Sequence, residues 1–78
     1  MDSKYVIASR YSDGKLGYVT NFDPILWGWE LNDGKIYDDW EEITNVFEKN
    51  CPAFQAILDS TDIVSIFIKT VPWSIQNY

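Results

Sequence analysis

An Asp-Gly pair at positions 13 and 14 constrains the fold of this chain more than any other local feature. The segments on its two sides, 4–12 and 15–22, are rich in β-branched and aromatic residues, and Asp-Gly favours the two-residue type I′ turn of a β-hairpin. That turn places Ser12 opposite Lys15 and fixes the later pairs along both strands. One face of the predicted hairpin then carries its large apolar side chains: Tyr5, Ile7, Tyr11, Leu16, Tyr18 and Phe22. Only one sheet face can be the main core face, so we expect the surplus aromatics to form a contact surface.

A β-meander is predicted to continue after this hairpin. Asp23-Pro24 ends the second strand, because proline cannot donate a hydrogen bond to the sheet and restricts the residue before it. Large apolar residues alternate with other residues over 25–31, which predicts a third strand with both tryptophans of that segment on one face. Asp33-Gly34 then predicts a second tight turn into a short strand at 35–37.

Two short helices and a last strand complete the predicted elements. Asp39 has the position of an N-cap, and the apolar spacing after it predicts a helix over about 39–49. Pro52 is a helix starter, and we expect its helix to end near Ser60. The stretch 63–71 is the most β-prone in the chain, with apolar residues on both sides, which predicts a central strand covered on both faces.

The sequence therefore predicts one compact α+β domain over residues 1–78, with an antiparallel sheet of about four to five strands. Its order is a β-meander, two short helices and a central C-terminal strand. Seventy-eight residues are too few for two domains. A composition of 46% hydrophobic residues, with 17% aromatic, is typical of a chain that packs a core. Pro72 ends the last strand and leaves 72–78 as a possible tail.

No catalytic machinery is recognisable in the sequence. The chain has no histidine, the commonest general base and an adaptable metal ligand. Its single cysteine, Cys51, has no imidazole to activate it, and we expect a packed structural thiol in a reducing compartment. Adjacent carboxylates occur without the spacing of a calcium-binding loop. We therefore expect a non-enzymatic protein with no catalytic residues, no metal site and no cofactor.

Acidic residues are concentrated between Asp23 and Glu48, where Lys35 is the single base. Two explanations remain open. In the first, the carboxylates form a solvated outer face with a capped helix. In the second, they join aromatic residues in an anionic surface that binds the basic surface of a host protein or nucleoprotein complex. The candidate partner-binding residues are Asp23, Glu30, Asp33, Asp38, Glu41, Glu42, Tyr5, Tyr11 and Tyr18.

The net charge of −6 at pH 7 limits the classes of partner. Direct binding to nucleic acid or to an anionic membrane requires clustered Lys and Arg, so we expect neither. The N-terminus lacks the pattern of a signal peptide, and the longest apolar run, 63–68, is broken by Ser65. We therefore expect a soluble, cytoplasmic protein.

In size, acidity, aromatic content and the meander-plus-helix layout of Lys4 to Phe47, the chain resembles short phage proteins that block bacterial defences. These include anti-CRISPR and anti-restriction inhibitors. The resemblance covers most of the chain and includes no diagnostic motif, so no functional residue is carried over from it. It implies stoichiometric inhibition of a host protein in the host cytoplasm, by occlusion or by mimicry of a nucleic-acid backbone.

Two other classes of function fit the same sequence. Tryptophans and tyrosines on a small sheet can bind a small molecule such as a nucleotide-like ligand, although few Lys and Arg residues are present to hold a phosphate. Alternatively, the surplus aromatics serve self-association, for example in a homodimer. A ligand that copurifies with the chain would favour the first alternative, and a stable homo-oligomer the second.

Overall fold

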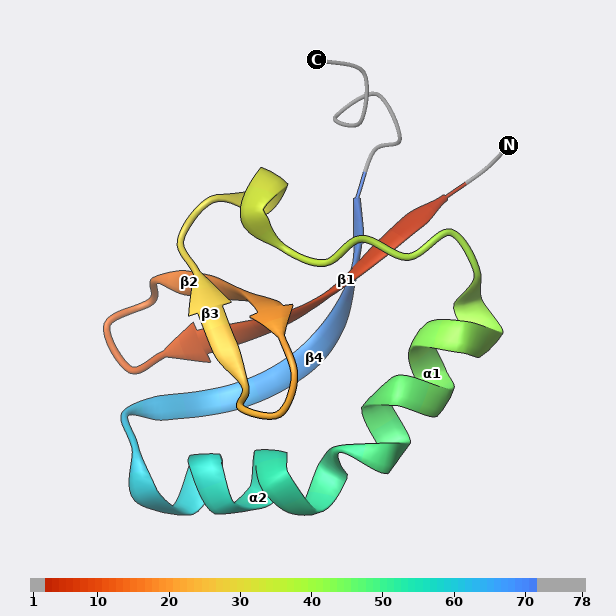
Figure 1. Cartoon of the computed structure of the whole chain (residues 1–78). Helices are drawn as coiled ribbons and strands as arrows, with labels where there is room; N and C mark the ends of the chain where they lie inside the picture. The colour runs from red at the N-terminus through yellow and green to blue at the C-terminus, as the bar shows by residue number, and fades with distance from the viewer. Residues whose placement is uncertain (1–2, 72–78) are drawn as a thin grey trace.

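The computed structural model describes residues 3–71, which form one antiparallel sheet with two helices (Figure 1). The predicted tail, 72–78, lies outside the described residues. The elements along the chain are β1 (Lys4–Tyr11), β2 (Leu16–Asn21), β3 (Leu26–Gly28), the 3-10 helix η1 (Leu31–Asp33), α1 (Trp40–Lys49), α2 (Cys51–Ser60) and β4 (Ile63–Val71). The strand order is β3-β2-β1-β4. The α+β class is confirmed, with a meander, two helices and a C-terminal strand.

The β1–β2 hairpin forms where the sequence predicts it, but its turn is one residue longer. The N–H of Gly14 donates to the carbonyl oxygen of Tyr11, and the N–H of Tyr11 donates to the carbonyl oxygen of Lys15, both at 2.9 Å. Gly14 has a φ of +92°, and Asp13 is not among the residues with positive φ. Three residues therefore connect the strands in a type I turn followed by a glycine bulge, in place of the predicted type I′ turn.

The extra turn residue shifts the register of the hairpin by one position. Tyr18 pairs with Ala8, whereas the two-residue turn would have paired it with Ser9. Because successive side chains of a strand point to opposite faces, Tyr18 lies on the face opposite to Tyr5 and Tyr11. The prediction of one aromatic hairpin face is therefore wrong.

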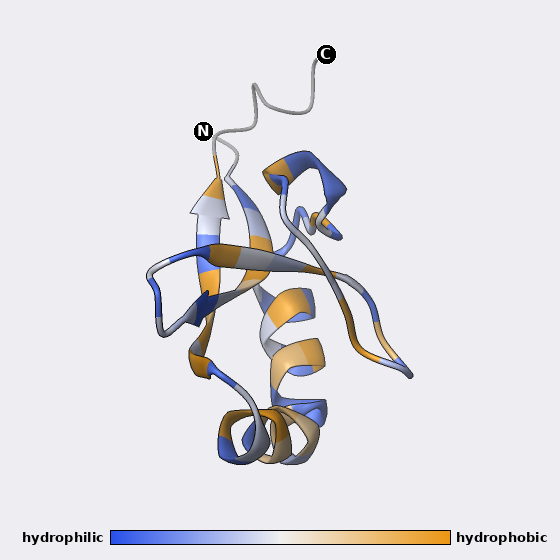
Figure 2. Ribbon diagram, turned by 90° about the vertical axis from the view of Figure 1, so that its left-hand side faces the viewer, coloured by the Kyte–Doolittle hydropathy of each residue, from blue (hydrophilic) through white to orange (hydrophobic). Residues whose placement is uncertain are grey.

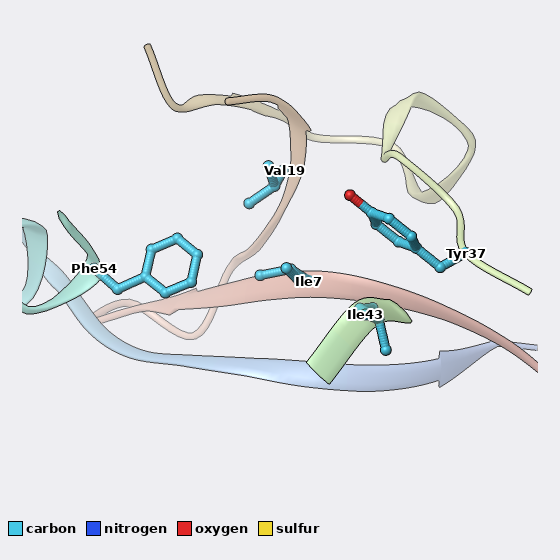
Figure 3. Packing of buried hydrophobic residues seen from close by; sticks show 5 residues of the cluster. All are labelled: Ile7, Val19, Tyr37, Ile43 and Phe54. Atoms are coloured by element: carbon cyan, nitrogen blue, oxygen red, sulfur yellow. The ribbon is translucent and has the colours of Figure 1, made fainter. Parts of the chain in front are cut away.

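The helices cover one face of the sheet and build the larger core on it. Ile7 of β1 and Val19 of β2 point toward the helices and meet the buried side chains of Tyr37, Ile43 and Phe54 (Figure 3). The side view in Figure 2 shows both helices on the same side of the strands, each with apolar segments. Ile43 is fully buried, so α1 is attached to the sheet at its centre.

The opposite face of the sheet has a smaller core. Val6, Ala8 and Tyr18 are buried there, and Leu31 and Ile36 of the segment after β3 pack against them. Gly34 makes the close approach possible, since a Cβ atom at this position would lie 2.7 Å from Cγ2 of Val6. Both faces of the sheet are therefore covered. The helices cover one face, and the irregular segment 31–36, named the strap, covers the other.

The third strand and the second turn differ from the prediction. β3 contains three residues, and η1 occupies the position of the expected second tight turn. The expected strand at 35–37 is reduced to one isolated bridge between Tyr37 and Tyr5. Gly34 is needed here for close packing and has an ordinary negative φ of −68°, so Asp33-Gly34 does not form the tight turn that this pair usually indicates.

β4 has the predicted bounds but lies at the edge of the sheet, beside β1. Ile66 and Ile68 pack against the helix-side core, and Phe67 packs against the strap-side core. The two-sided apolar pattern of β4 therefore reflects cover on both faces, which does not require a neighbouring strand on both edges. The prediction of a central position is wrong.

Both helices begin and end close to the predicted positions. The Asp39 carboxylate accepts a hydrogen bond from the N–H of Glu41 at 3.2 Å, which confirms this residue as the N-cap of α1. Pro52 lies in the first turn of α2, as expected of a helix starter. Within residues 3–71, no helix is long and apolar enough to cross a membrane.

Candidate functional site

An exposed aromatic pair marks the N-terminal end of α1. Trp40 is the first residue of this helix, and its side chain is 54% exposed. Its ring meets the ring of Tyr5 in an edge-on arrangement, with 5.3 Å between the ring centroids and 63° between the planes. The indole is thus supported on one side by β1 and open to solvent on the other.

The backbone holds this aromatic pair in place. Tyr5 and Tyr37 exchange two backbone hydrogen bonds of 2.8 Å, which ties the strap to β1 immediately before α1. The Asp39 cap then fixes the first turn of the helix. The backbone that carries Trp40 is therefore fixed on both sides of this residue.

Carboxylates flank Trp40 on both sides in the sequence. Asp38, Asp39, Glu41 and Glu42 are all exposed. Asp38 forms an ion pair with Lys4, and this is the only ion pair found within residues 3–71. Glu41 and Glu42 lie in the first turn of α1, where negative charge also suits the helix dipole. Below, the Trp40 surface means Tyr5, Asp38, Asp39, Trp40, Glu41 and Glu42.

The electrostatic effect of this cluster reaches the residue beneath it. Burial raises the pKa of Tyr37, and the negative charge of Glu42 raises it further. Both effects favour the neutral phenol, because burial disfavours a charged group and a second negative charge would repel a phenolate.

The remaining predicted acids lie elsewhere. Asp23 belongs to the loop between β2 and β3, whereas Glu30 and Asp33 lie at η1, and all three are exposed. Figure 1 shows that this loop, η1 and the start of α1 occupy three different corners of the fold. The six predicted acids therefore do not form one continuous surface. Asp38, Glu41 and Glu42 lie within two residues of the exposed Trp40.

The three predicted tyrosines also have separate environments. Tyr18 is buried in the strap-side core and is not available to a partner. Tyr5 supports Trp40, while Tyr11 lies against Trp29, with 5.2 Å between the ring centroids. Trp29 is 60% exposed, so the accessible aromatic surface consists of tryptophans supported by tyrosines.

Trp40 was missed at the sequence level because its spacing to Ile43 and Phe47 predicts a core-facing position. In the structure its ring meets Tyr5 of β1, and more than half of the side chain stays exposed. The sequence signal for its exposure is the run of four acids from Asp38 to Glu42 in which it stands.

Residues 3–71 contain no group of three or more acids or cysteines placed to hold a metal ion. Cys51 is exposed at the start of α2, so the expectation of a packed thiol is wrong. α2 uses a different stripe for packing, since Phe54 is its buried residue.

Comparisons with known proteins found no family model that matches this chain, and no similar protein among curated proteins or solved structures.

Proposed function

We propose that the chain is a non-enzymatic binding protein that inhibits a host defence or nucleic-acid-handling protein by placing the Trp40 surface on a basic region of that partner. The observation that carries the proposal is the exposed indole of Trp40, which is supported by Tyr5 and flanked in the sequence by exposed acidic residues. The resemblance to phage anti-defence proteins supports the class of partner.

Trp40 has the properties of an interface anchor. Tryptophan is among the residues that most often dominate binding energy, above all when it is rigid and becomes fully desolvated in the complex. Burying the exposed half of an indole contributes roughly 2 to 3 kcal/mol from apolar area alone. Because Tyr5 already restricts the ring, little of this energy is lost to ordering.

The surrounding carboxylates determine which partner the anchor meets. A protein that handles nucleic acid presents Lys and Arg where the phosphates bind. Acids on both sides of Trp40 are attracted to such a region and increase the rate of encounter, while an acidic region is repelled. The inhibitor would then occupy the groove that the nucleic acid needs.

Charge reversal at the Trp40 surface tests the proposal. Glu41→Lys with Glu42→Lys should abolish capture of the partner from native host lysate, and capture by the parent should weaken at high salt. Asp38 is left unchanged because its ion pair with Lys4 would become a repulsion. Glu48→Lys with Asp62→Lys is the matched control, since both residues are exposed, lie outside the Trp40 surface and change the net charge equally.

The proposal requires one identified protein that the parent and the control variant retain and that the test variant loses. Retention of the same protein by all three would contradict it. A stable homodimer that Trp40→Ala converts to a monomer would also contradict it, and light scattering on the two purified proteins measures this.

A further inference from the structure

A cavity of about 700 Å³ opens between the β2–β3 loop and the junction of α1 with α2. Figure 1 shows this loop reaching down toward the two helices. The cavity lies beside the C-terminal end of α1, whereas the Trp40 surface lies at its N-terminal end. The volume is within the range of about 300 to 1,000 Å³ that is usual for small-molecule sites.

Small residues on α2 keep this cavity open. Ala53 and Ala56 lie one turn apart on the helix and line the cavity, and both are exposed. Larger side chains at these positions would close the space between the helix and the loop. The apolar walls are completed by Phe22, Ile25, Val46 and Ile57.

Positive charge gathers at this cavity in an otherwise acidic protein. Lys35 and Lys49 line it, although the whole chain has only six basic residues and a net charge of −6. Lys35 is also the single base of the acidic stretch 23–48. Its backbone is fixed by a hydrogen bond of 2.8 Å from its N–H to the carbonyl oxygen of Val19. One acid, Asp23, lines the same cavity, so the lining contains two positive charges and one negative charge.

Tyr37 adds a neutral polar group to the lining. Its ring is buried in the helix-side core, and Figure 3 shows its hydroxyl on the side of the ring that faces Val19. A tyrosine hydroxyl keeps its proton at neutral pH and can donate a hydrogen bond, and the raised pKa of Tyr37 is in the same direction.

We propose that this cavity binds a small amphipathic monocarboxylate, with its apolar chain against the alanines of α2 and its carboxylate between Lys35 and Lys49. The site is separate from the Trp40 surface and does not depend on the function proposed for it.

The balance of charges favours a single carboxylate over a phosphate or a dianion. Asp23 compensates one lysine, so the lining has one positive charge in excess. A ligand with two negative charges would leave one of them uncompensated inside a protein of net charge −6, which is unfavourable. A neutral apolar ligand would use the walls but not the lysines.

An NMR titration of the amide resonances with octanoate tests the site directly. Octanoate should shift amides around 22–25, 35–37 and 46–57, and 1-octanol, which has the same chain without the charge, should bind at least about fivefold more weakly. Lys35→Gln with Lys49→Gln should weaken octanoate binding to the level of 1-octanol and leave 1-octanol binding unchanged.

Three variants distinguish binding in the cavity from effects of net charge and from binding at the Trp40 surface. Lys15→Gln with Lys69→Gln removes the same amount of charge outside the cavity and should leave the affinity for octanoate within about twofold of the parent. Ala53→Trp fills the cavity from an exposed position and should abolish binding of both ligands while the melting curve stays cooperative. Trp40→Ala should bind octanoate as the parent does.

Equal affinities for octanoate and 1-octanol in the parent would overturn the proposal. Octanoate shifts that map outside the cavity, or full octanoate binding by the Lys35→Gln, Lys49→Gln variant, would overturn it as well.

Discussion

The two exposed tryptophans of the described chain stand at opposite ends of β1, and each lies against a tyrosine of that strand. Trp40 meets Tyr5 at 5.3 Å, and Trp29 meets Tyr11 at 5.2 Å. Their exposed fractions are similar, 54% and 60%. Tyr5 and Tyr11 lie on the same face of β1, about 20 Å apart along the strand. The two sites are therefore close to a matched pair.

The two ends of β1 differ in the number of acidic residues beside the tryptophan and in the packing of the tyrosine that supports it. Four acids flank Trp40 in the sequence, whereas Gly28 and Glu30 flank Trp29. Tyr5 packs against the helix-side core, and Tyr11 packs beside Gly17 near the turn. An exposed aromatic side chain is therefore not by itself a binding site, and the neighbouring carboxylates and the rigid base distinguish the Trp40 end.

The largest expected effect is a difference in stability between alanine variants of the two supporting tyrosines. Tyr5→Ala should lower the free energy of unfolding by about 2 to 4 kcal/mol, because it removes a ring that packs on the core and under Trp40. Tyr11→Ala should cost only about 1 to 2 kcal/mol, since its ring is not part of that core. Urea denaturation of both variants measures the difference. Equal losses would show that the two ends have the same support.

A smaller effect is expected at the turn that carries Tyr11. Gly14→Ala should cost about 1 kcal/mol, because the positive φ strains an L-residue while its Cβ meets no neighbour within 4 Å. The loss should not reduce partner binding, because the Trp40 surface lies at the other end of β1. A thermal melt and a binding assay on the same preparation check both statements, and an unchanged melting temperature would contradict the glycine bulge.

The smallest effect concerns the pH dependence of the Trp40 end. Tyr37 pairs with Tyr5, and its pKa in the folded protein is raised above the ordinary value of 10.0. The unfolded chain loses this proton first, so the stabilisation is complete below about pH 10 and is lost as the pH rises toward the folded pKa. Tyr37→Phe should make the alkaline loss of stability shallower. The quantity to compare is the change in unfolding free energy between neutral and alkaline pH. An equal change in parent and variant would contradict the raised pKa.

Local signals predicted most of the fold correctly. The Asp-Gly turn, the Asp39 cap and Pro52 each act within a few residues of the chain, and they located the hairpin and both helices. The bounds of β4 followed from its β-prone composition. These signals depend on local backbone preferences, and tertiary packing overrode one of them at Asp33-Gly34, where a 3-10 helix replaced the expected turn.

The register, the strand order and the site could not be predicted in the same way. A glycine at position 14 suits both a two-residue turn and a three-residue turn with a bulge, and the choice between them decides the face of Tyr18. The edge position of β4 depends on how the helices return to the sheet. The exposure of Trp40 depends on which parts of the chain pack on the first turn of α1, and helical periodicity does not contain this information.

The most direct test of the central claim is the affinity of the captured partner for Trp40→Ala and Trp29→Ala, measured by calorimetry beside the parent. Trp40→Ala should weaken binding at least about tenfold, because it removes the anchor, and Trp29→Ala should stay within about twofold. Both residues are exposed, so both variants should remain folded in a thermal melt. Parental affinity for Trp40→Ala, or an equal loss for Trp29→Ala, would contradict the assignment of the binding surface to the Trp40 end of the molecule.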